Sequence, residues 1–384
     1  MKMFLNIKLS KIFINLLIFL FFTLCSFLVC EIIIRNTLIF EKFGFQSPLS
    51  LKERIEKHTK LDQFNNKNII IIGDSNVEYM RGSKHNFLEI AEKSLENNFN
   101  IKLLNFGFGG AGIKDYILIF KKLNQEEIQF KDVFFFIDNH NDYFDYYYYI
   151  KNDLTGSEMS DEKVFDKLDF SIKKFLKKSV FINAIYRNIL KRYFKIGYGK
   201  SLDNNINHLK KIFNVDENLI RKRLEKIPQN YVKLSKADII SSWWLSFALT
   251  LPEMKLLDHF GYKEKKEEVS IAIANDINTI NSMCGQFNKN CHLFFLPDQV
   301  TLNKKYHKLY ESLNFELNDN MSSINYHEKL IADLLKNEKI KVNSLFLTFL
   351  DKNDIYIDLD THLNFYGNKI LSKYIENYII NSVH

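Results

Sequence analysis

The sequence is poor in the residues that mark non-globular or disulfide-scaffolded chains. It has 13 glycines and 4 prolines among 384 residues, which excludes collagen-like and low-complexity classes. Four cysteines are too few for a disulfide scaffold. No long Lys/Arg block is present, and 53 basic against 46 acidic residues give a net charge of only +7, so nucleic acid is not an expected partner. With 46% hydrophobic residues, the chain can bury the core of one large domain or two ordinary ones.

The first organised segment is an apolar run at 12–34, preceded by Lys2, Lys8 and Lys11. About 20 such residues span a bilayer as a helix. The run is longer than a signal-peptide core and has no A-x-A-like site, and bulky Val29 before Cys30 disfavours lipoprotein cleavage. We therefore expect a cytoplasmic amino terminus at 1–11, a transmembrane helix at 12–34 and a linker at 35–65. By the positive-inside rule, the remainder is periplasmic or extracellular, and the protein is single-pass.

The cysteines fall into two groups under this topology. Cys25 and Cys30 lie in the expected span, whereas Cys284 and Cys291 lie in the outer part, where disulfides persist. These two bracket one predicted helix-to-strand turn, so we expect a disulfide between them. A zinc site is disfavoured because His292 alone does not complete a ligand set, and we expect no metal.

Residues 66–384 alternate between strand and helix patterns. Continuous apolar runs without alternation are typical of strands buried on both faces of a parallel sheet. They occur at 68–72, 101–106, 133–137, 292–296 and, briefly, 355–357. Helical patterns occur at 86–97, 115–123, 268–283 and 367–380. The pattern predicts a doubly wound α/β domain with a helical insertion at about 143–270, a segment too long for one crossover.

A serine follows the first predicted strand, in the order Gly73-Asp74-Ser75-Asn76. At a strand-to-helix turn a serine hydroxyl can project as a nucleophile while nearby N–H groups face a developing oxyanion. The same residue types are also favoured as helix N-caps. By itself, this block leaves the two interpretations equal.

Four glycines lie within six positions after the second strand: Gly107, Gly109, Gly110 and Gly112. Gly107, Gly109 and Gly112 fit the dinucleotide pattern G-x-G-x-x-G. That pattern usually follows the first strand, and an extracytoplasmic domain has little access to NAD, so we expect no cofactor. A glycine turn beside the serine can instead present a backbone N–H.

Two further polar blocks follow later strands. Asn139 and Asn141 come after the third strand, where an asparagine amide can donate to an oxyanion or cap a turn. His362 follows the last predicted strand, and Asp358 and Asp360 lie close before it. An acid beside a histidine can orient the ring and stabilise the imidazolium.

Together these blocks resemble the SGNH/GDSL superfamily of serine esterases and acyltransferases. The matches are Gly73-Asp74-Ser75, Gly110, Asn141 and His362, in family order, over about 66–145 and 290–384. The last block of the superfamily is usually Asp-x-x-His, but here Leu359 stands where that block has its aspartate. Asp360-Thr-His362 is instead similar to the membrane-anchored branch that includes alginate O-acetyltransferase-like proteins. Asp358 stays open as the acid and Asn139 as the amide donor.

The resemblance implies a flavodoxin-like sheet of the SGNH hydrolase type and an acyl-enzyme mechanism. Ser75 would be the nucleophile, His362 the base and Asp360 its acid, with Ser75, Gly110 and Asn141 forming the oxyanion hole. The implied substrate is an ester, often an O-acetyl group of a cell-surface glycan, and a multispan acyl donor is a possible partner. Hydrolase and transferase are not distinguished. The alternative function is an inactive glycan-binding module that partners a membrane acyltransferase.

The insertion is expected to supply the substrate wall. A basic set at 173–192 favours a solvated face over contact with anionic lipid or glycan. Trp243 and Trp244 lie in a helical pattern that favours core packing over stacking on sugar rings.

Overall fold

The computed structural model describes most of the chain after residue 50. It describes residues 15, 18–19, 21–30, 32–33, 51–60, 64–78, 86–126, 128–139, 142–143, 146, 150, 200–236, 240, 242–250, 266–302, 304–313, 315, 326–336, 338, 340–350, 352, 354–357 and 362–382.

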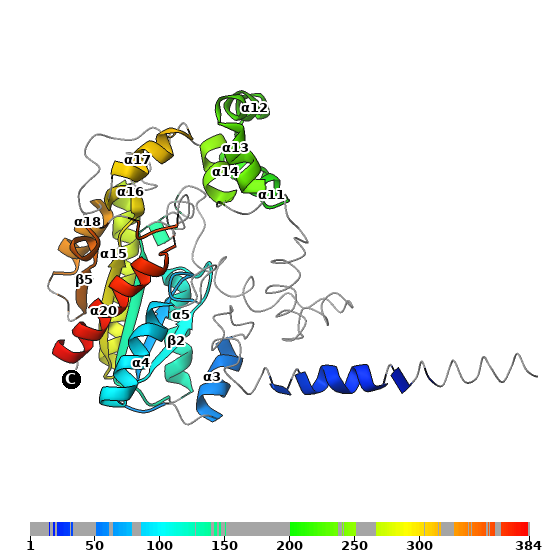
Figure 1. Cartoon of the computed structure of the whole chain (residues 1–384). Helices are drawn as coiled ribbons and strands as arrows, with labels where there is room; N and C mark the ends of the chain where they lie inside the picture. Colours follow the sequence, from blue (N-terminus) through cyan, green and yellow to red (C-terminus); the bar gives the residue numbers. More distant parts are fainter. Residues whose placement is uncertain are drawn as a thin grey trace, which may run out of the picture.

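A five-stranded parallel sheet forms the centre of the molecule (Figure 1). Its strands are β1 (Ile69–Gly73), β2 (Leu103–Gly107), β3 (Asp132–Asp138), β4 (Asn290–Leu296) and β5 (Lys341–Ser344). They lie in the order β2-β1-β3-β4-β5, and every neighbouring pair is parallel. This is the flavodoxin-like order of a doubly wound sheet, so the predicted α/β class with a parallel sheet is confirmed.

Helices connect and cover the strands. The described helices are α3 (Leu51–Lys60), α4 (Phe87–Phe99), α5 (Ile113–Gln125), α11 (Lys200–Phe213), α12 (Glu217–Lys226), α13 (Gln229–Lys236), α14 (Ser242–Thr250), α15 (Lys266–Gln286), α16 (Gln299–Leu302), α17 (Lys304–Glu311), α18 (Tyr326–Leu334), α19 (Phe346–Phe349) and α20 (Phe365–Ser382).

The sheet is covered on both faces, and β3 shows why its apolar run does not alternate. The Phe135 ring packs against Phe120 of α5, with ring centroids 5.5 Å apart. The next residue, Phe136, packs against Phe87 of α4 at 5.1 Å. Helices α4 and α20 pack together, as do α5 and α15. Successive side chains of β3 therefore pack on opposite faces of the sheet, which accounts for an uninterrupted apolar strand.

The last strand differs from the prediction. The fifth strand is β5, and the short run at 355–357 adds no strand to the sheet; Tyr356 instead makes an isolated antiparallel bridge with Leu363. β5 lies at the edge of the sheet and its side chains are half-buried or exposed. An edge strand with exposed side chains needs no continuous apolar run, so the apolar pattern did not predict β5.

Helix α3 lies within the segment that the sequence predicted as a linker. Its Leu51, Ile55 and His58 side chains are buried, and the His58 ring lies 5.5 Å from that of Phe106 in β2. The packed domain therefore extends back at least to Leu51 and does not start at residue 66.

The described part of the predicted insertion is helical. Helices α11 to α14 gather at the end of the molecule where α16 and α17 follow β4 (Figure 1). Trp244 of α14 is buried against Tyr310 of α17, with ring centroids 4.8 Å apart, whereas Trp243 is 43% exposed. Core packing thus holds for Trp244 but not for its neighbour. The basic segment at 173–192 lies outside the described residues.

The predicted membrane segment at 12–34 is described only in part, and residues 21–30 are helical. A search of the described residues finds no helix with both the length and the apolar character needed to cross a membrane.

A disulfide joins Cys284 at the end of α15 to Cys291 in β4, in the pairing that the sequence predicted. Their Cα atoms are 6.2 Å apart, and both residues are buried. The bond ties a helix to the strand that follows it, and closure of so short a loop contributes only about 2–3 kcal/mol.

Glu92 of α4 provides a test of stability against pH. Burial raises the pKa of its carboxyl from 4.5 to about 7, although its Oε1 accepts a hydrogen bond from Leu103 N at 3.1 Å. The folded protein therefore holds this proton more tightly than the unfolded chain, and the free energy of unfolding falls as pH rises from 4.5 to 7. Glu92→Gln keeps an acceptor for Leu103 N and has no proton to lose.

We expect Glu92→Gln to raise the free energy of unfolding above pH 7 by up to about 3 kcal/mol and to change it little at pH 4.5. Urea titrations at pH 4.5 and 8 measure this difference. Glu56→Gln, at an exposed position of α3, is the control. An equal gain at both pH values would contradict the assignment.

Candidate active site

Ser75 lies in a tight turn at the carboxyl end of β1. The N–H groups of Val77 and Glu78 donate to Asp74 O at 3.2 and 2.9 Å, and Asn76 N donates to Asp74 Oδ1 at 2.8 Å. Asp74 and Asn76 are buried, whereas Ser75 is half-buried. Because α4 takes Asn86 as its N-cap, Ser75 is not the cap of that helix. The turn thus holds a partly accessible hydroxyl.

His362 lies against this hydroxyl. Its Nε2 is 2.8 Å from Ser75 Oγ, a distance suited to a hydrogen bond between a nucleophile and its base. The histidine follows a short antiparallel pairing in which Ile357 N donates to His362 O at 3.0 Å. The structure therefore brings together two site residues that are 287 positions apart in the sequence.

The two candidate acids lie outside the described residues. Asp358 and Asp360 fall between Ile357 and His362, whose backbones pair. The choice of Asp360 over Asp358 stays a prediction.

Asn76 connects the serine turn to the histidine loop. Its Nδ2 donates to Asp138 Oδ2 at 2.6 Å, and its Oδ1 accepts from Leu363 N at 3.3 Å. One amide thus joins the ends of β1 and β3 to the residue after His362. The sequence analysis named Asn76 only as the neighbour of Ser75. Its position directly after the candidate nucleophile was the one indication that it could belong to the site.

The site lies where the strand order reverses. β1 has β2 on one side and β3 on the other, so the loops after β1 and β3 separate at the carboxyl edge of the sheet. Open α/β sheets bind ligands at such a switch point. Ser75 follows β1, and Asn139 follows β3.

Gly110 occupies a reverse turn after β2. Ala111 N donates to Phe108 O at 2.9 Å, and Gly110 has a φ of 80°. Positive φ at the third position is typical of a type II turn and favours glycine. A Cβ at Gly110 would meet nothing within 4 Å, so the requirement is conformational. In the described part of the chain, the N–H groups of Gly110 and Ser75 donate to no acceptor.

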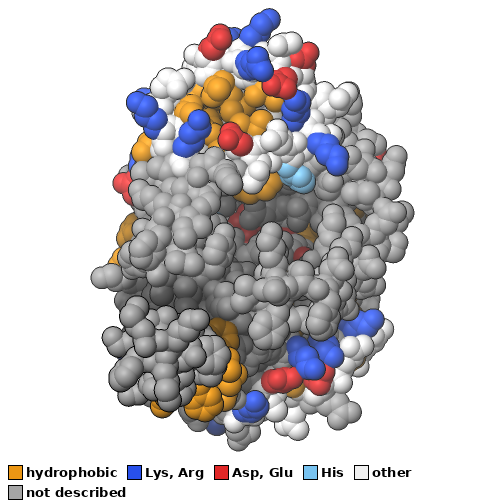
Figure 2. Space-filling model, turned by 90° about the vertical axis from the view of Figure 1, so that its right-hand side faces the viewer, with side chains coloured by type: hydrophobic (Ala, Val, Ile, Leu, Met, Phe, Trp, Pro, Cys, Tyr) orange, Lys and Arg blue, Asp and Glu red, His pale blue; other side chains and the backbone are white. Residues whose placement is uncertain are grey.

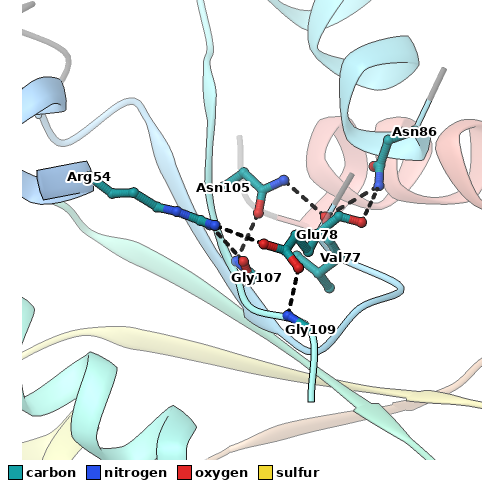
Figure 3. Close-up of polar contacts among 7 residues, drawn as sticks. All are labelled: Arg54, Val77, Glu78, Asn86, Asn105, Gly107 and Gly109. Carbon is teal, nitrogen blue, oxygen red and sulfur yellow. Dashed lines mark hydrogen bonds and ion pairs between the residues drawn. The ribbon is translucent and has the colours of Figure 1, made fainter. Parts of the chain in front are cut away.

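The glycine turn lies directly against the serine turn. Phe108 N donates to Gly73 O at 3.0 Å, and a Cβ at Gly107 would lie 2.5 Å from Glu78 N. Asn105 Nδ2 donates to Val77 O at 2.9 Å (Figure 3). Gly107 is therefore needed for the close approach of the two backbones, and this approach packs the start of the glycine turn against the serine turn.

A dinucleotide phosphate fits this turn poorly. Gly109 N already donates to Glu78 Oε2 at 2.7 Å. The Glu78 carboxylate faces the glycines and would repel the negative charge of a pyrophosphate. The sequence analysis likewise favoured a backbone N–H donor over a dinucleotide site at this turn. Among the described residues, no three His, Cys, Asp or Glu side chains come together in a group that could hold a metal ion.

Asn139 has a structural role. It is buried; its Nδ2 donates to Glu328 Oε2 at 2.7 Å, and its Oδ1 accepts from the Tyr143 hydroxyl at 3.1 Å. Burial raises the pKa of the Glu328 carboxyl. These bonds direct the Asn139 amide into the core and favour Asn141 as the oxyanion donor. Asn141 lies outside the described residues.

Buried carboxylates make the site electronegative. Asp74 Oδ2 lies 3.5 Å from Ser75 Oγ, and Asp138 and Asp142 are also buried. Burial and then the charges of Asp142, Asp74 and Asp138 raise the pKa of Tyr116 well above its usual value.

Comparisons with known proteins leave the family of the chain open. No model of a known protein family matches it. The chain is similar to protein Ycf2 of Physcomitrium patens, with 27% identity over 255 residues that cover 61% of this chain. The match spans only 10% of the length of that relative. These similarities therefore assign no function to the chain.

Proposed function

We propose that the chain is a serine esterase or O-acyltransferase of the SGNH type. The observation that carries the proposal is the 2.8 Å contact between Ser75 Oγ and His362 Nε2 at the switch point of the sheet. The paired serine and histidine favour an enzyme over the inactive glycan-binding module.

In the proposed reaction, Ser75 Oγ attacks the carbonyl carbon of an ester while His362 Nε2 takes the hydroxyl proton. The tetrahedral intermediate collapses as the carbon–oxygen bond to the alcohol breaks. His362 gives the proton to that alcohol, which leaves an acyl group on Ser75. Water or a sugar hydroxyl then attacks the acyl group, with His362 as base, and restores Ser75. Asp360 would hold the ring of His362.

The oxyanion would be bound by the N–H groups of Ser75 and Gly110 and by the Asn141 amide. The type II turn at Gly110 and its contact with Gly73 support this role. Loss of one such donor typically lowers turnover by about 10²–10³.

The proposed acceptor is a glycan at the cell surface, and the proposed partner is a multispan acyl-donor protein. Residues 200–236 of the insertion carry nine Lys and Arg against four Asp and Glu, and Trp243 is 43% exposed beside them. In Figure 2, apolar side chains surrounded by both basic and acidic side chains gather at the end of the molecule where α11 to α14 lie. An exposed indole can stack on sugar rings, and an excess of basic side chains nearby would attract sugars that carry negative charge.

Labelling of Ser75 tests the proposed chemistry. The full chain in detergent should release one burst equivalent of p-nitrophenol from p-nitrophenyl acetate and should react with a fluorophosphonate. Peptide mass spectrometry should place both adducts on Ser75. Failure of both reagents to modify Ser75 in folded protein would refute the acyl-enzyme proposal.

The proposed topology is a single span with the catalytic domain outside the cytoplasm. Within the predicted span, the described helical residues expose Phe21, Phe22 and Leu24 by more than half. A reporter that is active only in the cytoplasm, fused after His384, should be silent. Strong reporter activity would contradict the orientation and, with it, the surface-glycan substrate.

A further inference from the structure

Helix α3 reaches the glycine turn through Arg54. Its Nη1 donates to Gly107 O at 2.6 Å, and its guanidinium carbon lies 3.9 Å from the centroid of the Phe108 ring. Its Nη2 pairs with Glu78 Oε1 at 3.0 Å. One side chain thus contacts two consecutive residues that lead into Gly110.

Glu78 connects this arginine to both turns of the site. Its Oε2 accepts from Gly109 N at 2.7 Å (Figure 3). Its own backbone N–H donates to Asp74 O at 2.9 Å. Glu78 stands three positions after Ser75 in the serine turn. Arg54 bonds to Gly107 and to Glu78, and Gly109 bonds to Glu78. Together with the backbone from Gly107 to Gly109, these contacts close a ring that includes Phe108.

The pair is almost fully desolvated, since both side chains are only 6% exposed. A buried ion pair typically adds little net stability compared with apolar residues of similar size, whereas removal of one partner leaves a costly buried charge. The distinctive consequence of this pair is therefore geometric: it fixes the backbone immediately before Gly110.

We propose that Arg54 and Glu78 are positioning residues that hold the Gly110 N–H at the oxyanion of the ester, which makes α3 part of the catalytic unit. The catalytic part of this inference rests on the proposed function. The restraint on the turn does not, because it depends only on the ring of contacts. A displaced oxyanion donor lowers turnover even when the substrate still binds.

Amide hydrogen exchange of the full chain tests the restraint. In Arg54→Met, exchange in peptides that cover 105–112 should be at least about 10-fold faster than in wild type, while β3 and β4 remain protected. Lys52→Met removes the same charge from the exposed side of the same helix, where Lys52 is 79% exposed, and should leave exchange unchanged. Unaltered exchange at 105–112 in Arg54→Met would overturn the proposal.

Hydrolysis of p-nitrophenyl acetate tests the catalytic part. Arg54→Met should lower kcat by about 10²-fold and change KM by less than about twofold, while Lys52→Met matches wild type. The double variant Arg54→Met and Glu78→Met removes both buried charges and should recover most of the thermal stability. Its kcat should stay low, since the ring is still broken.

The outcomes separate the two proposals. Recovery of kcat together with stability in the double variant would show that the pair is only structural. If the wild-type chain forms no acyl-enzyme, the proposed function fails, whereas the exchange experiment still decides whether the pair restrains the turn.

Discussion

Replacing Ser75 with alanine is expected to eliminate acyl-enzyme formation and to lower kcat for p-nitrophenyl acetate by roughly 10⁶-fold. Alanine has no oxygen to attack the carbonyl, so only the residual effect of binding and of the oxyanion donors remains. His362→Ala should cause a loss of similar size, because the Ser75 hydroxyl then has no base 2.8 Å away. Burst kinetics and fluorophosphonate labelling measure both variants.

The double variant Ser75→Ala and His362→Ala provides a stronger test. Residues that act as one unit have non-additive effects, so the double variant should be no less active than either single variant. Ser94→Ala, in α4, where the hydroxyl donates to Glu376, is the control and should keep full activity. Full activity in Ser75→Ala would remove the basis of the proposed mechanism.

Asp360→Asn is expected to reduce kcat by about 10⁴-fold, by analogy with other triads in which the amide imposes the wrong histidine tautomer. Asp360 is the acid nearer to His362 in the sequence, and the prediction rests on that separation. Asp358→Asn should have a much smaller effect. The two variants make a matched pair because each converts one carboxylate into an amide.

The kcat of both variants at several pH values measures this prediction. A severe loss in Asp358→Asn with a mild one in Asp360→Asn would reassign the acid to Asp358 and leave the roles of Ser75 and His362 unchanged.

Much of the fold could be predicted because a parallel sheet buries both faces of its strands. The run at 133–137 predicted β3, and its phenylalanines do pack on opposite faces of the sheet. β5 was missed because an edge strand with exposed side chains lacks that run. Helix α3 was missed because its ten residues carry only a few apolar positions, which also fit a linker.

The site could be predicted in part. Ser75 and Gly110 follow β1 and β2 in recognisable local patterns, and His362 follows an apolar run that was predicted as a strand but makes only an isolated bridge. The contact between Ser75 and His362 joins residues 287 positions apart, so it depends on the strand order and not on spacing. Arg54 and Glu78 were not found, because an arginine on a short helix and a glutamate after a turn are ordinary surface residues until packing buries them.

The free edge of β2 has a consequence for how the domain behaves when shortened. Three side chains satisfy backbone groups along this edge strand: Glu92 accepts from Leu103 N, Asn105 from Gly107 N, and Arg54 donates to Gly107 O. Unpaired groups on an apolar edge strand are a template for strand addition by another copy. A fragment that starts at residue 66 would lack Arg54 and the helix beside β2. Such a fragment should self-associate, whereas one that starts before Leu51 keeps the edge covered.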